Sequence, residues 1–352
     1  WTSTATRIQA GADESAAAGH TVSAAEAYLR ASTYFSIASY QADAAEQPPS
    51  FAELWEQSRS CWDRFCELHE PGGEPVEIPY EGTTLPGWFF RSGAVGEPRR
   101  TLIFNNGSDG GPFAAWVQGV AAALERGWNA LVFDGPGQNA AMVRQQLWFR
   151  ADWEKVITPV VDHLLTRDDV RADGIALLGV SQGGYWVPRA VAFEHRIAAA
   201  VADPGVLDVG TTMLDHLPHS MVKLLDAGDQ AKFDRNMHMS ERVSRQLRAM
   251  AALRFRPYGT DSAFEVFTRA QQMSLTDEVI AAIECPVLVT DPDHEQFWPG
   301  QPKELYEKLP GPKAIVSFTT DDGADGHCEP AANRLRAQRI FDWLDEQIPV
   351  TP

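Results

Sequence analysis

The chain has 352 residues, of which 44% are hydrophobic, so it can bury a large core in one elaborated domain or in two domains. Its 48 acidic and 30 basic residues give a formal net charge of −18. This charge repels phosphate backbones and anionic headgroups, which argues against nucleic acid or a membrane surface as a partner. No apolar run approaches the roughly 18 residues that a membrane span needs.

The four cysteines are scattered, and none forms a Cys-x-x-Cys pair or the repeated spacing of a zinc site. We therefore expect reduced thiols in a cytoplasmic protein, with no metal and no cofactor. The amino terminus has neither the basic start nor the apolar stretch of a signal peptide. Because Trp1 is not a methionine, we expect that residues before it have been removed.

Residues 1–72 are predicted to form a helical cap domain. Alanine, leucine and aromatic residues recur at helical spacing from about Ala16 to Glu70, and Ser23 and Ser50 are candidate amino-terminal caps. Pro71-Gly72-Gly73 ends this region. Short strand-like runs then follow at 76–80 and 87–91.

Strands and helices alternate through the next segment, 73–204. Short apolar strands separated by amphipathic helices predict a mostly parallel sheet with helices on both faces, in which ligands bind beyond the carboxyl ends of the strands. The predicted strands are 101–105, 130–133, 175–178 and 198–202, and the predicted helices are 113–126, 147–166 and 185–195.

The alternation stops over residues 205–282, where the pattern is helical and free of strands. An insertion at this point is well placed to act as a lid. The sheet resumes in the segment 283–352, with strands at 286–290 and 314–318 and helices at 302–309 and 331–348. The complete pattern predicts an α/β fold with an eight-stranded, mostly parallel sheet, an amino-terminal helical cap and a helical lid.

The most informative motif is Gly179-Val180-Ser181-Gln182-Gly183, directly after the apolar run 175–178. It has the form of a nucleophile elbow, a tight strand-to-helix turn that pushes a serine hydroxyl into a cleft. The pattern alone is weak, but a predicted strand precedes it and a predicted helix follows it. The sequence therefore predicts that Ser181 forms a covalent acyl intermediate.

A serine hydroxyl needs an imidazole to take its proton and a carboxylate to orient that imidazole. His327 is the only histidine after the final predicted strand, and a loop with two glycines precedes it. The candidate acids Asp291, Asp293 and Glu295 lie in the turn after the strand 286–290. Asp203 and Asp208, after the preceding strand, are further alternatives.

Acyl transfer also needs hydrogen-bond donors for the developing oxyanion. The backbone N–H of Gln182, next to the nucleophile, is one candidate donor. The second is expected from the glycine-containing loop 106–111, where we select Ser108. This loop has no Gly-Lys-Ser/Thr ending and no Gly-x-Gly-x-x-Gly pattern, so it does not indicate a phosphate-binding site.

These features together resemble the α/β-hydrolase superfamily, and more narrowly its branch with an amino-terminal helical cap. That branch includes 2,6-dihydroxypseudooxynicotine hydrolase, fungal polyketide-shortening hydrolases and FrsA-like esterases. The resemblance spans nearly the whole chain. The stretches that carry it are Asp134-Gly135-Pro136-Gly137-Gln138, Gly179 to Arg189, Glu295 to Pro302 and Gly323 to Cys328.

The resemblance implies that the catalytic acid lies nine residues after the strand's leading proline, which selects Glu295 after Pro286, with Asp293 as the second choice. Relatives more often carry aspartate at this position. They also usually carry a small residue where Asn139 stands.

The resemblance also implies a serine hydrolase that cleaves esters, or carbon–carbon bonds next to a ketone, in aromatic or polyketide-like small molecules. The candidate pocket residues are Trp298, Tyr185, Phe113, Met213 and His216. A homodimer is expected from the apolar helical cap. The alternative functions are a peptidase of the same fold and a binding protein with little turnover. A dehalogenase is disfavoured because its chemistry needs a carboxylate at the elbow.

Overall fold

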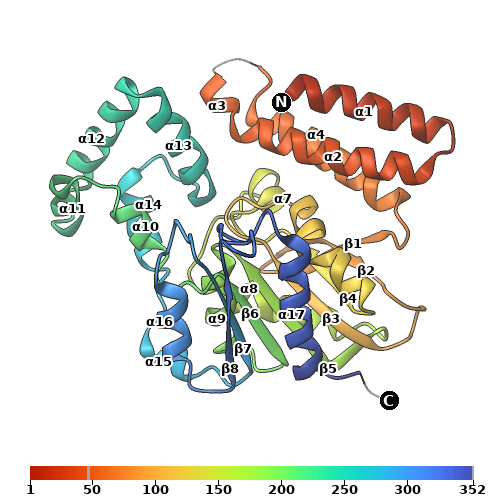
Figure 1. Ribbon diagram of the computed structural model, residues 1–352. Helices are drawn as coiled ribbons and strands as arrows, with labels where there is room; N and C mark the ends of the chain where they lie inside the picture. The colour runs from red at the N-terminus through yellow and green to blue at the C-terminus, as the bar shows by residue number, and fades with distance from the viewer. Residues whose placement is uncertain (46–47, 351–352) are drawn as a thin grey trace.

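The computed structural model describes residues 1–45 and 48–350 (Figure 1). Within them, eight strands form one sheet in the order β1-β2-β4-β3-β5-β6-β7-β8. β1 pairs with β2 and β2 with β4 in antiparallel fashion, whereas all the other neighbours are parallel. This arrangement confirms the predicted fold class. The strands are β1 (Gly73–Tyr80), β2 (Thr83–Phe90), β3 (Arg99–Asn105), β4 (Asn129–Phe133), β5 (Val170–Val180), β6 (Ala199–Asp203), β7 (Val287–Pro292) and β8 (Lys313–Phe318).

Helices cover both faces of the sheet because neighbouring residues of each strand point to opposite sides. Ile103 and Leu177 belong to the core cluster that includes α8 and α9, whereas Leu102 and Leu178 belong to the cluster on the other side. The first face carries α8 (Glu154–Leu164), α9 (Gly183–Val191), α15 (Asp277–Ala281) and α16 (Gln301–Lys308), and the second carries α6 (Ala121–Glu125) and α17 (Asn333–Gln347).

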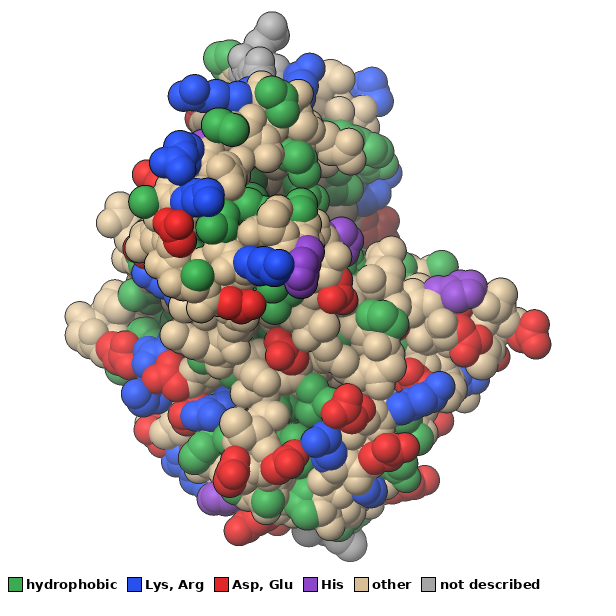
Figure 2. All heavy atoms as spheres, turned by 90° about the vertical axis from the view of Figure 1, so that its left-hand side faces the viewer, with side chains coloured by type: hydrophobic (Ala, Val, Ile, Leu, Met, Phe, Trp, Pro, Cys, Tyr) green, Lys and Arg blue, Asp and Glu red, His purple; other side chains and the backbone are tan. Residues whose placement is uncertain are grey.

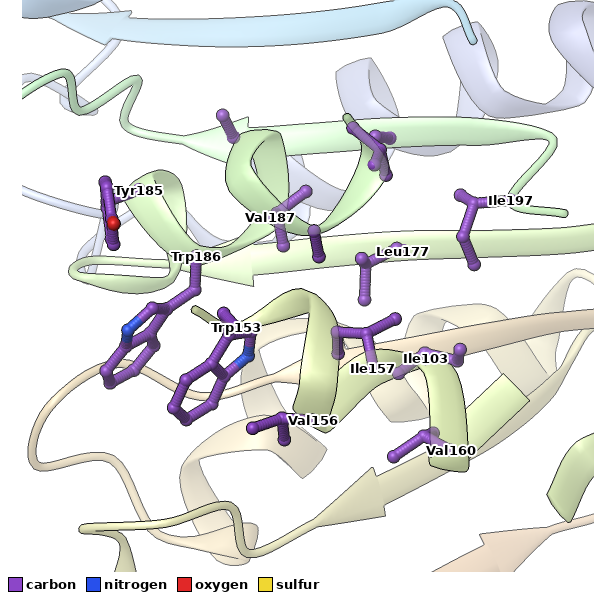
Figure 3. Packing of buried hydrophobic residues seen from close by; sticks show 14 of the residues in the cluster. Ile103, Trp153, Val156, Ile157, Val160, Leu177, Tyr185, Trp186, Val187 and Ile197 are labelled. Atoms are coloured by element: carbon purple, nitrogen blue, oxygen red, sulfur yellow. The ribbon is translucent and has the colours of Figure 1, made fainter. Parts of the chain in front are cut away.

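Two tryptophans pack closely on the first face. The rings of Trp153 and Trp186 stack with centroids 4.0 Å apart and an interplanar angle of 12° (Figure 3). The Trp153 indole N–H also donates to Asn105 Oδ1 at 2.8 Å, at the carboxyl end of β3. The same core residue therefore supports the loop that follows β3.

The amino-terminal region is helical, as predicted: α1 (Thr2–Ala17), α2 (Thr21–Tyr40), α3 (Ala42–Ala45) and α4 (Phe51–Leu68). Ser50 is confirmed as the cap of α4, where it forms a capping box with Glu53. The prediction for Ser23 is wrong, because α2 begins two residues earlier and Ser23 lies inside its first turn. The buried Trp62 of α4 packs edge-on against Trp88 of β2 and so anchors the cap region to the sheet.

The segment between β6 and β7, described throughout, contains helices and one short 3₁₀ turn. They are α10 (Gly210–Leu214), α11 (His219–Asp226), α12 (Gln230–Val243), α13 (Arg245–Phe255), the turn Arg256–Tyr258, α14 (Ala263–Gln271) and α15. This lid lies beside the cap region at one end of the sheet, and α13 contacts α3 (Figure 1). The division of the chain at residues 72, 204 and 282 stays a prediction.

The outer surface of the lid differs from that of the core. Figure 2 shows charged side chains of both signs interspersed over the lower, core part of this face, and hydrophobic side chains more frequent in its upper part. Exposed hydrophobic residues of α12 and α13 are Met239, Val243, Leu247 and Met250.

Two predicted helices differ from those observed. The helix predicted over 147–166 begins only at Glu154, because the preceding backbone bonds to other loops: Leu147 O accepts from Gly137 N–H, and Phe149 N–H donates to Pro257 O. The helix predicted over 113–126 is divided into α5 (Pro112–Ala115), a π-helical turn over Trp116–Val120, and α6. A further short helix, α7 (Asn139–Val143), follows β4.

Candidate active site

Ser181 lies at a tight turn between β5 and α9. Its φ is +59°, in the left-handed region that non-glycine residues rarely adopt. The turn needs glycine at Gly179, where an added Cβ would lie 2.2 Å from Gly183 O. Two further backbone contacts hold the corner, since Ser181 N–H donates to Asp203 O at 2.6 Å and Gly184 N–H donates to Ser181 O at 2.8 Å. The local fold therefore has the geometry of a nucleophile elbow.

His327 lies between Ser181 and Glu295. Its Nε2 is 2.9 Å from Ser181 Oγ, and its Nδ1 is 2.7 Å from Glu295 Oε2. The side chain of His327 is 12% exposed and that of Glu295 is 3% exposed, so water competes little for these hydrogen bonds. The structure thus brings the side chain of Ser181 together with those of Glu295 and His327, which follow it more than 100 residues later in the chain.

Glu295 is held in place by its own loop. Its second oxygen, Oε1, accepts the backbone N–H groups of Phe297 at 2.8 Å and of Trp298 at 3.1 Å. The rings of both residues also flank the imidazole, with Phe297 at 4.7 Å and Trp298 at 5.8 Å from His327 between centroids. The carboxylate and the imidazole are therefore oriented by the same short segment.

The alternative acids point elsewhere. Asp293 is exposed, and its carboxylate accepts the N–H of Thr320 at 3.2 Å. Asp291 lies 3.4 Å from Lys303 Nζ. Asp208 accepts the N–H of Thr211 at 3.2 Å. Asp203 is fully buried and pairs with Arg336.

The loop after β3 passes directly beside the elbow. A Cβ added to Gly107 would lie 2.7 Å from Ser181 Cβ, so only glycine allows this approach. The loop carbonyls of Asn106 and Gly107 accept hydrogen bonds of 2.8 and 2.7 Å from Gln138 Nε2. Ser108 follows Gly107, and its hydroxyl accepts a 3.3 Å bond from Arg254 of the lid. Gln182, after the nucleophile, is buried, and its side-chain amide contacts Met273 Sδ.

Comparisons with known proteins agree with this architecture. No family model matches the chain. An α/β hydrolase of Xenoacremonium sinensis, xenA, is 30% identical over 99% of this chain and 87% of the relative. The chain belongs to the α/β-hydrolase family. The hydrolase LUC6 of a Fusarium species is 29% identical over 98% of this chain and 86% of the relative.

Among solved structures, 2,6-dihydroxy-pseudo-oxynicotine hydrolase superposes on this hydrolase with a TM-score of 0.78 at 20% identity. The match covers 99% of this chain and 88% of that one, so it includes the cap region and the lid. Together with the relatives of similar sequence, this shared fold supports the predicted branch of the superfamily.

A cleft beside Ser108 lies between the cap region, the core and the lid of the hydrolase. It holds about 390 Å³ of atom-free space, a volume that includes open solvent. Aromatic side chains of the cap face loop residues of the core and the end of α13. The lining residues are Tyr40, Phe51, Trp55, Ser108, Asp109, Gly137, Asn139, Met142, Leu253, Arg256 and Pro257.

A smaller polar cavity of about 260 Å³ shares Trp55 and Asn139 with this cleft. Asn139 accepts from Trp55 Nε1 at 3.3 Å and donates to Gly110 O at 2.9 Å, so its side chain is held in place where it forms part of the wall. Asp134 faces the cavity and is almost fully buried, and burial raises the pKa of its carboxyl to about 6.

The other predicted pocket residues have varied surroundings. Trp298 lies against His327, whereas Phe113 borders the polar cavity. Tyr185 is buried in the core and donates its hydroxyl to Ala151 O at 3.0 Å. Met213 packs between two clusters, and His216 is exposed on the lid with Nδ1 2.7 Å from Thr212 O. Their roles in substrate binding stay predictions.

Sequence reasoning did not select Gly107, Gln138 or Arg254 as site residues. Gln138 ends the stretch Asp134 to Gln138 that carries the family resemblance, so its position was visible, but its bonds to the loop after β3 were not.

Within the described ranges, no group of three or more His, Cys, Asp or Glu side chains is arranged to hold a metal ion. The part of the chain that the structure describes contains no helix long and apolar enough to cross a bilayer.

Proposed function

We propose that this hydrolase cleaves small-molecule substrates through an acyl-serine intermediate, with Ser181 as nucleophile, His327 as general base and acid, and Glu295 as the group that orients His327. The observation that carries the proposal is the continuous hydrogen-bonded chain from Ser181 Oγ through His327 to Glu295, at 2.9 and 2.7 Å. Nucleophile, base and orienting carboxylate at hydrogen-bond distance are the arrangement that activates a serine hydroxyl.

In the first half of the reaction, Ser181 Oγ attacks the substrate carbonyl carbon and His327 Nε2 takes the hydroxyl proton. The carbonyl oxygen becomes an oxyanion, for which the backbone N–H groups of Gln182 and Ser108 are the proposed donors. Two features support this role: Gly107 approaches Ser181 closely, and Gln138 occupies the carbonyl oxygens of Asn106 and Gly107 with hydrogen bonds.

Collapse of the tetrahedral intermediate breaks the bond to the leaving group, which takes the proton from His327. In the second half, His327 deprotonates a water molecule that attacks the acyl ester, and the acid is released while Ser181 regains its proton. An ester releases an alcohol in this scheme. Cleavage of a carbon–carbon bond requires a leaving carbanion stabilised by resonance, as in a β-dicarbonyl or a phenol-bearing ketone.

The proposed substrate class is aromatic or polyketide-like. The cleft beside Ser108 supports it, because Tyr40, Phe51 and Trp55 supply flat apolar surface next to the loop 106–111. The full-length structural similarity to a protein named as a 2,6-dihydroxy-pseudo-oxynicotine hydrolase is consistent with that class.

Two experiments test the proposal. A fluorophosphonate probe should label wild-type protein at Ser181, as read by mass spectrometry, and should leave folded Ser181→Ala unlabelled. A parallel screen compares aryl esters and β-diketones with aminoacyl arylamides. Turnover of the first two classes that is lost in Ser181→Ala supports the proposal, whereas turnover confined to the arylamides would indicate a peptidase. Activity that persists in Ser181→Ala would refute it.

A further inference from the structure

Next to the segments that carry the proposed catalytic residues lies a buried cluster of three ionisable side chains, Asp203, Arg336 and Glu329. All three are 0% exposed. The Arg336 guanidinium donates to the Asp203 carboxylate and to Gln118 O, and its Nε lies 3.3 Å from Glu329 Oε2. Charged groups removed from water are costly and are expected to be paired. We call these three residues the Asp203 network.

Asp203 ends β6, and its contacts reach the segments that carry all three proposed catalytic residues. Its backbone carbonyl accepts the Ser181 N–H at 2.6 Å and the Cys328 Sγ–H at 3.6 Å. Its Oδ1 accepts the Thr290 hydroxyl at 2.6 Å, and Thr290 lies in β7, five residues before Glu295. One residue therefore contacts the nucleophile itself, the neighbour of His327 and the strand that leads to Glu295.

Glu329 provides the second link to the histidine loop. Cys328 and Glu329 directly follow His327, and both adopt left-handed φ angles, +58° and +47°. Two consecutive non-glycine residues in this region are unfavourable unless their surroundings hold them there. The surroundings here are the buried Arg336, contacted by Glu329, and the carbonyl of Asp203, contacted by Cys328.

The charges within the cluster are compatible with complete burial. Burial raises the pKa of Glu329, and the charge of Asp203 acts in the same direction, whereas Arg336 opposes the shift. The net shift favours the neutral, protonated form of Glu329, in which the negative charge of Asp203 is balanced by Arg336. Buried ion pairs can often be replaced by well-packed hydrophobic residues without loss of stability. A contribution to stability alone therefore does not explain this cluster, and a role in holding the geometry of the site is favoured.

We propose that the Asp203 network is a positioning device that holds the Ser181 turn, the His327 loop and the end of β7 in one relative geometry. This inference rests on the proposed function, since it concerns the alignment of the same three side chains. Asp203, Arg336 and Glu329 act through their neighbours and are positioning residues. Loss of the network should slow the chemical step more than it weakens substrate binding, because the substrate cleft is lined by other residues.

The principal test is the double variant Asp203→Asn/Arg336→Met, which removes both charges and leaves no unpaired ion in the core. The matched control is Asp169→Asn. Asp169 is also buried and is bound by Arg91 at 2.7 Å and Arg167 at 2.9 Å, but it precedes β5, at the end of that strand opposite Ser181. Thermal unfolding identifies temperatures at which both variants are fully folded.

We expect the double variant to lose at least tenfold in kcat and in its fluorophosphonate labelling rate, with KM changed less than twofold. The apparent pKa of its kcat/KM profile should also shift, because His327 no longer has its wild-type hydrogen-bond geometry. Asp169→Asn should retain wild-type values of all four quantities. A folded double variant with wild-type kcat, labelling rate and pH profile would overturn the positioning role.

Glu329 is tested separately. Glu329→Gln keeps the shape and neutrality of the protonated carboxyl and should retain kcat within twofold, whereas Glu329→Ala should lose about as much as the double variant. Equal rates in both variants and the wild type would remove Glu329 from the network. If wild-type Ser181 fails to react with the probe, the proposed function and this inference both fall. If the wild type reacts and the network variants react at the wild-type rate, the inference alone falls.

Discussion

The side-chain amide of Gln138 donates a 2.7 Å hydrogen bond to the carbonyl oxygen of Gly107. Gly107 lies in the loop after β3 and passes close to Ser181, because an added Cβ would lie 2.7 Å from Ser181 Cβ. Gln138 is buried, and its Oε1 accepts the Gly135 N–H at 2.9 Å, so its orientation is determined on both sides. The turn after β4 thus holds the proposed oxyanion loop in place.

Replacing Gln138 with methionine should therefore lower kcat by about 10- to 100-fold, somewhat less than the loss of an oxyanion donor itself. KM should change little, because the amide lies behind the loop. Steady-state kinetics with an aryl ester measure both parameters. Gln145→Met is the control, since that half-buried amide binds Thr84 O of β2 at 2.6 Å rather than the loop after β3. An unchanged kcat in folded Gln138→Met would contradict this assignment.

Glu295→Gln tests the choice among the acids of the β7 loop. The substitution keeps the shape of the side chain but removes the charge that stabilises the imidazolium, so kcat/KM should fall by roughly 10³- to 10⁴-fold. Asp293→Asn should stay within about threefold of wild type, because Asp293 is exposed and binds Thr320 N–H. Stopped-assay rates of both variants with one aryl ester make the comparison, and the reverse order would assign the role to Asp293.

Asp134 should make stability depend on pH in an unusual direction. Burial raises the pKa of this carboxyl to about 6, above its value in the unfolded chain, so the folded state binds the proton more tightly. The protonated Asp134 carboxyl therefore contributes to the free energy of unfolding fully below about pH 4. This contribution, up to about 3 kcal/mol, is lost as pH rises through 6. Asp134→Asn removes this loss.

Urea unfolding of wild type and Asp134→Asn at several pH values between 4 and 8 measures the difference. The free energy of unfolding of the variant, minus that of the wild type, should increase as pH increases across this range. A constant difference between the two proteins would show that Asp134 has an ordinary pKa in the folded state.

Arg256 joins the lid to the cap region above the cleft. It pairs with Asp43 at 2.6 Å and lies over the Phe51 ring at 3.8 Å. Arg256→Met should loosen this wall of the cleft and raise KM about three- to tenfold, with kcat nearly unchanged.

Wild-type KM should also rise with salt, whereas the KM of Arg256→Met should not, because salt screens the partly exposed pair. Arg334→Met, which removes an exposed pair with Glu125 whose residues do not line the cleft, should behave as wild type. Identical salt responses in all three proteins would exclude the pair from substrate binding.

The sequence was sufficient to predict the eight strands and the main helices in their succession along the chain, and the elbow at Ser181, because these depend on local patterns. Apolar runs of four or five residues mark buried strands, and glycines two positions from Ser181 allow its turn. It also placed His327 after the last strand and Glu295 after β7. Boundaries were less predictable: Leu147 to Asp152 reads as helix, yet its backbone bonds to the loops at Gly137 and Pro257.

Which side chains meet depends on the folding of distant segments against one another. Asp203, Asp293 and Glu295 are equivalent as carboxylates in the sequence, but the fold pairs the first with Arg336, exposes the second and brings the third to His327. The contacts of Gln138 with Gly107 and of Asp203 with Ser181 likewise join residues distant in the chain. Hydrogen bonds and ion pairs act over a few ångströms in space, and no local sequence pattern encodes that proximity.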